Sequence, residues 1–401
     1  MGKVLISFIG GPARERSKYS MARYDFGGSC VQETTSITEA IVRAKNIDKV
    51  FLFGTVGSMW DEIYYKFSTN KNIYDEDVYS EIYEHCCNSD YNSELTVPHK
   101  EKIEESLGGG SKIYLLKYGL NEEEFEYNSN IVLGIEKELS KGDELYLDIT
   151  HSFRSIPVYV MTLVMYLRQA STKKIKIKSI SYGMAEMQKT LNASPVTDLK
   201  STLTINDWIS AAYAFSEFGN AEKIVKLLKK DRNEDAAKKL EKFSNMLSIN
   251  YITGIKQVLH EIQAINYDKL SPIAKMVIEP VISDFVSSIG SDKRVWQIIL
   301  NLAKWHFDKK HYAAAYICLT EAVVKRYASV NNVGNNKAKE IISRDKKDGI
   351  SQAYREVNKY RIAIAHQTDS RACTDPDIII KTFSRNYNLF VEGFREDIIA
   401  K

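Results

Sequence analysis

One short segment combines residue types that bind phosphate: Asp148-Ile149-Thr150-His151-Ser152-Phe153-Arg154. It lies where an apolar run typical of a strand, residues 144–149, gives way to an apolar run typical of a helix, residues 157–167. The first N–H groups of a helix have no partner within the helix, and the helix dipole adds partial positive charge, so an anion is stabilised there. Hydroxyl and guanidinium groups add donors. The segment therefore predicts an anion-binding turn, although a capped, buried helix would use similar residues.

The carboxylate of Asp148 ends this predicted strand. It could accept a hydrogen bond from a ribose hydroxyl, or hold His151 and Arg154 in place. Thr150, Ser152 and Arg154 supply the donors of the turn. We therefore predict that Asp148, Thr150, His151, Ser152 and Arg154 contact a phosphate-containing ligand.

Polar or glycine-containing segments also follow other predicted strands. The members of these segments that we predict to contact the ligand are Gly10, Gly11, Arg14, Thr55, Ser58, Trp60, Tyr182 and Met184. In a parallel sheet the carboxyl ends of the strands meet at one edge, so the segments would form one crevice, with Trp60 available to stack on or wall off a base. Glycines after strands are often only turn residues. The chain lacks Gly-x-x-x-x-Gly-Lys and a full Gly-x-Gly-x-x-Gly, which disfavours ATP hydrolysis and NAD chemistry.

A second polar group interrupts an apolar helical segment near the C-terminus, at Asn358, Arg361 and His366. His366, with a usual pKa of about 6.5, can exchange a proton with an RNA 2′-hydroxyl or a leaving 5′-oxygen. Arg361 can stabilise a phosphorane-like transition state, and Asn358 can orient either group. On a helix, Arg361 and His366 lie about 140° apart, so they converge only through Arg361's reach, a distortion or a second copy of the chain. The group suits metal-independent RNA cleavage, although a surface arginine and a structural histidine would look the same.

The elements that must position these residues fall into two halves. Strand patterns at residues 3–9, 49–54, 112–117, 144–149 and 175–182 alternate with helical patterns and predict an α/β domain with a mostly parallel, doubly wound sheet. Residues 61–110 resemble an insertion or a helical excursion over that sheet. Strand patterns stop near residues 195–205, and the remainder predicts an all-α region, in which residues 331–349 form a loop. We therefore expect one domain at 1–200 and a helical region at 201–401.

Composition narrows the class of protein. At 401 residues the chain is too long for one core of ordinary size. A net charge of +3 excludes a strongly basic nucleic-acid coat but not a local basic cleft. Five scattered cysteines without a Cys-x-x-Cys spacing indicate a reducing cytoplasm and no structural zinc. No apolar run approaches the roughly 20 residues of a membrane span, and His260, His306 and His311 lack matched partners, so we expect them to be structural.

Both polar groups resemble motifs of known families. Asp148-Ile149-Thr150-His151-Ser152 resembles the Asp-x-Thr-His-Gly signature of the CRISPR-associated DxTHG-motif proteins, with Ser152 in place of glycine. The segment from Gly54 to Trp60 is similar to the Gly-Thr-x-Gly-Ser-x-Trp segment of that family. Arg361-x4-His366, with Glu321 on the preceding helix, resembles the motif of HEPN ribonucleases, with Ile362 where a polar residue is common. The resemblance implies a Rossmann-like CARF domain followed by a HEPN domain.

The resemblance to CARF-HEPN proteins of type III CRISPR systems also implies an activity. In that group a cyclic oligoadenylate bound to the CARF domain activates the ribonuclease, and a homodimer builds both sites. We therefore expect a homodimer, with higher order open, that cleaves single-stranded RNA without a metal and leaves 2′,3′-cyclic phosphate and 5′-hydroxyl ends. Analogy favours cyclic tetra-adenylate over hexa-adenylate as activator, with no other cofactor. The alternatives are a catalytically silent sensor that relays to a partner, and a sensor that also degrades its ligand.

Overall fold

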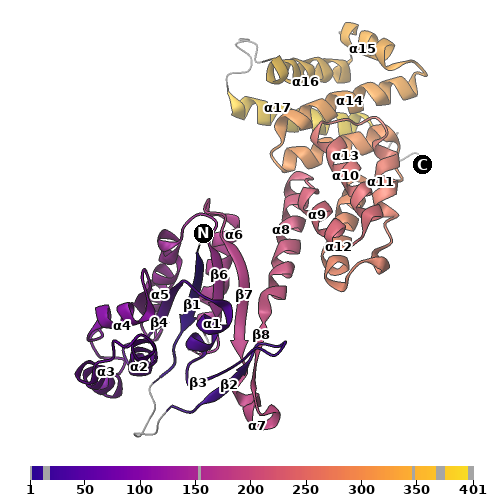
Figure 1. Cartoon of the computed structure of the whole chain (residues 1–401). Helices are drawn as coiled ribbons and strands as arrows, with labels where there is room; N and C mark the ends of the chain where they lie inside the picture. The colour runs from indigo at the N-terminus through magenta and orange to yellow at the C-terminus, as the bar shows by residue number, and fades with distance from the viewer. Residues whose placement is uncertain (1, 12–18, 152–154, 346–347, 367–374, 396–401) are drawn as a thin grey trace. The chain divides into compact units, whose positions relative to one another are not determined.

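The computed structural model describes residues 2–11, 19–151, 155–345, 348–366 and 375–395 (Figure 1). The chain divides into two compact units, Met1–Thr202 and Leu203–Lys401. The first unit is an α/β structure and the second is all-helical. This is the fold class that the sequence predicts. None of the helices described is long and apolar enough to cross a membrane.

The first unit is built on one eight-stranded sheet with the order β3-β2-β8-β7-β6-β1-β4-β5. Its strands are β1 (Lys3–Phe8), β2 (Ala22–Asp25), β3 (Val31–Thr34), β4 (Lys49–Gly54), β5 (Lys112–Leu115), β6 (Glu144–Asp148), β7 (Lys176–Gly183) and β8 (Ser194–Asp198). Strands β5, β4, β1, β6 and β7 pair in parallel with one another, in that order. Strand β8 pairs antiparallel with β7 and parallel with β2, which pairs antiparallel with β3. The sheet is therefore mostly parallel, as the sequence predicts.

Helices cover both faces of the sheet (Figure 1). They are α1 (Ile37–Lys45), α2 (Trp60–Asn70), α3 (Glu76–Asn88), α4 (Lys100–Leu107), α5 (Glu122–Gly134), α6 (Ile156–Gln169) and the short α7 (Gln188–Leu191), with 3₁₀ turns at Ile135–Glu138, Ala185–Met187 and Leu199–Ser201. On one face, Leu5 and Leu52 of the sheet join a buried cluster with side chains of α1, α2, α3 and α4. The segment 61–110 is thus a helical excursion, α2 to α4, that packs on the sheet.

The second unit contains ten helices within the part of the chain described. They are α8 (Thr202–Phe218), α9 (Glu222–Lys230), α10 (Glu234–Ser248), α11 (Ile255–Gln263), α12 (Pro272–Ile289), α13 (Val295–Asp308), α14 (Tyr312–Val330), α15 (Asn335–Arg344), α16 (Gly349–His366) and α17 (Pro376–Gly393), with a 3₁₀ turn at Tyr267–Lys269. One continuous core joins them, from Trp208 in α8 to Phe390 in α17. Helix α14 lies against both α13 and α16, and α16 packs on α17. This core fixes the helix that carries Asn358 and Arg361.

His306 lies inside this core, near the end of α13. It is 3% exposed, and neither ring nitrogen has a hydrogen-bond partner among the residues described. Its ring contacts the rings of Trp305 and His311, with centroids 5.0 and 5.7 Å away. Burial, and to a lesser extent His311, lowers the pKa of His306 to about 4. His306 is therefore a neutral core residue at physiological pH.

One local expectation about the fold is wrong, and three strands were not predicted. The region 331–349, expected as a loop, contains α15, because Ala338 and Ile342 are buried one helical turn apart and anchor it to the core. Strands β2, β3 and β8 were not expected, because they are four or five residues long and carry polar or charged side chains. Their pairing with one another and with β7 stabilises them.

Candidate functional site

Strand β1 lies at the switch point of the sheet. After β1 the chain forms β2 and β3 at the far edge, then runs through β4 and β5 on one side of β1 and returns on the other side through β6 and β7. Because β4 and β7 lie on opposite sides of the β1–β6 pair, a crevice forms at the carboxyl ends of these two strands. The residues that follow β1, β4, β6 and β7 are those that the sequence selects as ligand contacts.

Asp148, the last residue of β6, is fully buried. Its carboxylate accepts hydrogen bonds from Ser7 Oγ at 2.6 Å, Thr150 N at 3.0 Å and Thr150 Oγ1 at 2.6 Å. Burial raises the pKa of Asp148 above its usual value, while these hydrogen bonds and nearby His151 oppose the shift. The prediction that Asp148 accepts from a ribose hydroxyl is wrong, because no ligand reaches a buried carboxylate already used in this way. Asp148 instead orders the turn that follows.

The turn after β6 is tied to both neighbouring strands. Thr150 Oγ1 accepts a hydrogen bond from Gly183 N, at the end of β7, at 2.8 Å. The Cβ of His151 lies 3.8 Å from the place where Gly10 would carry a Cβ, so this turn adjoins the segment after β1. Both Thr150 and His151 are half-buried. The structure therefore brings Gly10, Thr150 and His151 together at the switch point.

The remaining predicted contacts near this turn have different outcomes. The half-buried Tyr182 donates its hydroxyl hydrogen bond to Glu186 at 2.9 Å, and Met184 N donates to Pro195 O at 2.9 Å. Tyr182 thus lies near the end of β7 and Met184 directly follows this strand, at the edge where the turn lies. Arg14, Ser152 and Arg154 lie outside the residues described.

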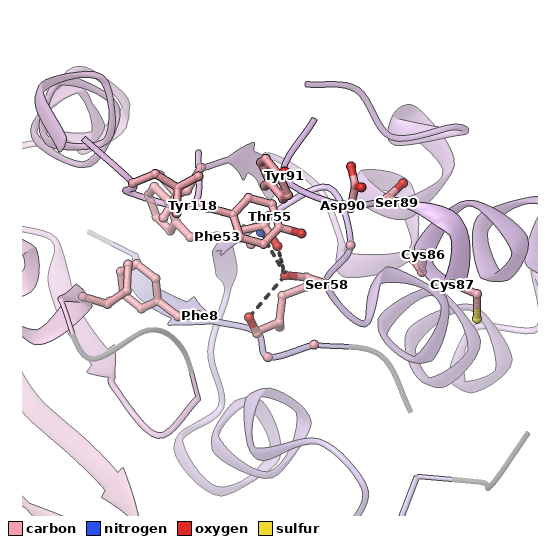
Figure 2. A pocket seen from close by; sticks show the side chains of 18 residues that line it. Phe8, Phe53, Thr55, Ser58, Cys86, Cys87, Ser89, Asp90, Tyr91 and Tyr118 are labelled. Carbon is pink, nitrogen blue, oxygen red and sulfur yellow. Dashed lines mark hydrogen bonds between the residues drawn. The ribbon is translucent and has the colours of Figure 1, made fainter. Parts of the chain in front are cut away.

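A cavity of about 640 Å³ opens beside the switch point (Figure 2). Its walls come from the ends of β1 and β4, the C-terminal end of α3, the segment after β5 and the start of α6. Four predicted contacts line it: Gly10, Gly11, Thr55 and Ser58. A cavity of this size is in the range of small-molecule sites. We therefore regard it, together with the turn after β6, as the candidate ligand site.

The turn after β4 is closely packed. Ser58 Oγ accepts a hydrogen bond from Thr55 N at 2.8 Å and lies 3.4 Å from the carbonyl oxygen of Ile9. A Cβ on Gly54 would lie 2.7 Å from atoms of both Ile9 and Trp60, so only glycine fits at this position. The turn is therefore held rigidly against the end of β1.

Trp60 does not face the cavity. Its side chain is fully buried, and its indole N–H donates to Thr55 O at 2.8 Å. The prediction that Trp60 stacks on or walls off a base is therefore wrong. Trp60 instead packs against the turn after β4 and stabilises it. The sequence could not distinguish this role from a ligand contact, because Trp60 is the first residue of α2 and lies next to that turn.

Sequence reasoning missed the aromatic and polar residues of the other wall. Ser89, Asp90 and Tyr91 follow α3, and Tyr118 follows β5, and all four line the cavity. Cys87 also lines it and is exposed, whereas Cys86 is buried, which raises the pKa of its thiol to about 12. The only signal in the sequence was the acidic, tyrosine-rich composition of 61–110, which does not indicate a binding wall.

The C-terminal polar group lies on α16. Arg361 Nε donates a hydrogen bond to Asn358 Oδ1 at 2.9 Å, so Asn358 holds the guanidinium. Tyr354 lies nearby, and its pKa is raised by burial and by Glu321 and lowered by Arg361. Glu321 is on α14, with α15 between it and α16 in the sequence. It forms an ion pair with Lys339 at 2.8 Å.

His366 is the last residue of α16, and its side chain lies outside the description. Its contact with Arg361, and the role of both residues, therefore stay predictions. In the described ranges, His, Cys, Asp and Glu side chains form no group of three or more that could hold a metal ion.

Comparison with known proteins identifies both units. Residues 4–186 match the family model described as the CARF domain of CRISPR system endoribonuclease Csx1. Residues 204–293 match the second domain of CRISPR-associated protein MJ1674. The first unit thus matches a Csx1-type CARF domain, and part of the second matches a domain of a CRISPR-associated protein. The cavity and the turn after β6 thus belong to the CARF domain.

Individual relatives extend this result. The chain is 30% identical over 352 residues to CRISPR-associated protein MJ1674 of Methanocaldococcus jannaschii, a match that covers 83% of this chain. The chain spans 55% of the length of that relative. A solved structure of Enterococcus italicus Csm6 bound to cyclic hexa-2'-fluoro-hexa-dAMP aligns with 98% of this chain and 95% of its own, at 13% identity and a TM-score of 0.36.

Proposed function

We propose that this protein is a cyclic-oligoadenylate-activated endoribonuclease of type III CRISPR defence. The observation that carries the proposal is the match of residues 4–186 to the CARF domain of an endoribonuclease, together with a cavity of about 640 Å³ at the switch point of that domain. A CARF domain that senses a nucleotide needs such a site. The helical unit, in the proposal, supplies the ribonuclease.

Backbone and hydroxyl groups would hold the phosphates of the ligand. Gly10 and Gly11 line the cavity, and the turn with Thr150 and His151 adjoins Gly10. Glycines allow the backbone to approach a phosphate closely, and the start of α6 adds a helix N-terminus beside them. A cyclic ligand repeats the same nucleotide, so two copies of the chain related by a two-fold axis could hold one ring.

In the ribonuclease step, an RNA 2′-oxygen attacks the adjacent phosphorus, and the bond to the 5′-oxygen breaks. His366 takes the 2′-hydroxyl proton or gives a proton to the leaving 5′-oxygen. Arg361 stabilises the charge on the phosphorane-like transition state. The products would be a 2′,3′-cyclic phosphate and a 5′-hydroxyl, with no divalent metal taking part.

Asn358 fits this scheme as a positioning residue. Its bond to Arg361 uses Nε, so the donors on the two terminal nitrogens of the guanidinium are not used for Asn358. Those donors have the planar geometry that suits a phosphate. Arg361 and His366 lie about 140° apart on the helix. In this proposal, a second copy of the chain therefore supplies the residues that complete the active site.

The test is cleavage of a fluorescent single-stranded RNA in EDTA, without nucleotide and with cyclic tri-, tetra- or hexa-adenylate. We expect one ring size to activate cleavage, and cyclic tetra-adenylate is the ring that we expect to do so. The His366→Ala variant should bind the same ring and cleave nothing. Cleavage that persists in this variant would place the active site elsewhere.

The same assay separates two other functions. Tight nucleotide binding without RNA cleavage under any condition would favour a sensor that relays to a partner. Linear oligoadenylate appearing when His366→Ala is incubated with the ring would indicate that the CARF domain degrades its own ligand.

A further inference from the structure

The far wall of the cavity is rich in hydrogen-bond acceptors. If Gly57 carried a Cβ, that atom would lie 3.0 Å from the carbonyl oxygen of Ser89 and 3.7 Å from that of Cys86, so these carbonyls lie against a glycine of the cavity lining. They belong to the C-terminal end of α3, where the helix dipole places partial negative charge. Asp90 adds a carboxylate to the same wall. A phosphate is therefore disfavoured there.

The described part of the cavity lining offers no positive charge to compensate these acceptors. Among the described residues that line the cavity, none is a lysine or an arginine. Donors for a phosphate lie where Gly10, which lines the cavity, adjoins the turn after β6. The site thus has one part suited to phosphate, at Gly10, and another part, at Ser89 and Asp90, suited to a neutral group that donates hydrogen bonds.

Aromatic side chains also line the cavity (Figure 2). Phe8 and Phe53 stack on each other with ring centroids 5.1 Å apart and are almost fully buried. Tyr91 and Leu120 line the cavity while 61% and 64% exposed, and Tyr118 lies beside them. Large apolar groups exposed at the mouth of a cavity mark a binding surface, and flat rings stack well on tyrosine.

We propose that the part of the cavity lined by Ser89, Asp90 and Tyr91 is a pocket for a purine base. Asp90 selects adenine by accepting a hydrogen bond from its exocyclic amine. The inference rests on the proposed function and names the group that makes the site specific. Within the described residues, the hydrogen bonds to the Asp90 carboxylate, from Asn92 N at 2.8 Å and Ser93 Oγ at 3.3 Å, both fall on Oδ1. Oδ2 can therefore accept from the ligand.

This geometry makes Asp90→Asn a sharp test. The variant keeps an oxygen for Asn92 N and Ser93 Oγ, so the loop is preserved. At the Oδ2 position it places an N–H donor where the wild type has an acceptor. Such a donor suits hypoxanthine, whose carbonyl oxygen replaces the amine of adenine. The preference between the two bases should therefore fall or reverse.

The experiment measures binding, by calorimetry, of cyclic oligoadenylate and of the ring of the same size built from inosine. The wild type should favour the adenine ring by about 10- to 100-fold, since a site that accepts from an amine rejects a carbonyl. Asp90→Asn should remove or invert that ratio. Asp77→Asn, an exposed aspartate at the other end of α3, is the matched control and should keep it.

A second variant tests the stacking surface. Tyr91→Ala should weaken both rings by a similar factor, about 5- to 100-fold, and leave their ratio unchanged. Adenine preference that survives in Asp90→Asn would overturn the inference while the proposed function stands. If the wild type binds neither ring, the proposed function itself fails, and this inference fails with it.

Discussion

Protonation of His306 should control the acid stability of this protein. The usual histidine pKa is 6.5, and burial lowers the value for His306 to about 4. Above pH 6.5 both the folded and the unfolded states are neutral at this position, and the full stability is present. As the pH falls from 6.5 toward 4, the unfolded chain takes up a proton that the folded chain does not, so stability is lost. At about 1.36 kcal/mol per pH unit, the loss amounts to roughly 3 kcal/mol.

The perturbation is His306→Phe, which keeps an aromatic ring beside Trp305 and His311 and removes two buried nitrogens without partners. The assay is urea unfolding of the full chain, followed by circular dichroism from about pH 7.5 to about pH 4.5. The difference in unfolding free energy between variant and wild type should grow in favour of the variant, by an amount that approaches roughly 3 kcal/mol.

The difference between the two curves isolates His306, because both chains share every other titrating group. Asp61 is one of these, and burial raises its pKa, so its contribution runs in the opposite direction with pH. His260→Gln, at an exposed histidine of α11, should follow the wild type. Parallel curves for His306→Phe and the wild type would refute the reasoning, because they would mean that the buried ring accepts a proton in the folded state.

Three further outcomes follow from the two sites. Gly54→Ala should destabilise the CARF domain by about 1–3 kcal/mol in thermal unfolding and weaken ligand binding, whereas Gly11→Ala, with nothing within 4 Å of its added Cβ, should retain wild-type stability. Asp148→Ala should cost about 2–4 kcal/mol because Ser7 and Thr150 lose a buried acceptor, and wild-type stability would contradict that role. Asn358→Ala should lower kcat for RNA about 10-fold or more with little change in KM or in ligand affinity; an effect on KM alone would argue against positioning of the catalytic arginine.

The sequence predicts the central strands well and the edge of the sheet poorly. Strands β1, β4, β5 and β6 contain apolar runs that mark them as buried, and β7 alternates apolar with polar residues. Strand β2, with Ala22-Arg23-Tyr24-Asp25, has no such run and forms because β8 and β3 lie beside it. The pairing of β2 with β8 joins segments far apart in the chain and leaves no local signal, and the short, polar strands of the β2–β3 hairpin carry no apolar run.

Some residues of the candidate site could likewise be predicted from the sequence, and others could not. Backbone turns such as Gly10 and Thr55-Ser58 could be predicted, because strand ends and glycines are visible in the sequence. The direction in which a side chain points could not be predicted. Trp60, for example, was expected to contact the ligand but is buried. Asp90 and Tyr91 reach the cavity only because α3 packs on the sheet, a tertiary contact that their own sequence does not encode.

The cysteine thiols of this protein differ in burial, so one of them can be labelled selectively. Burial raises the pKa of Cys86 and of Cys318 to about 12, so these two thiols stay protonated and unreactive at neutral pH. Cys87 is exposed and lines the cavity, while Cys30 is half-buried away from it. With Cys30 and Cys373 replaced by serine, a maleimide dye would attach at Cys87, at the mouth of the cavity. Its emission would then follow the arrival and departure of a ligand in real time, in the intact chain and without a labelled nucleotide.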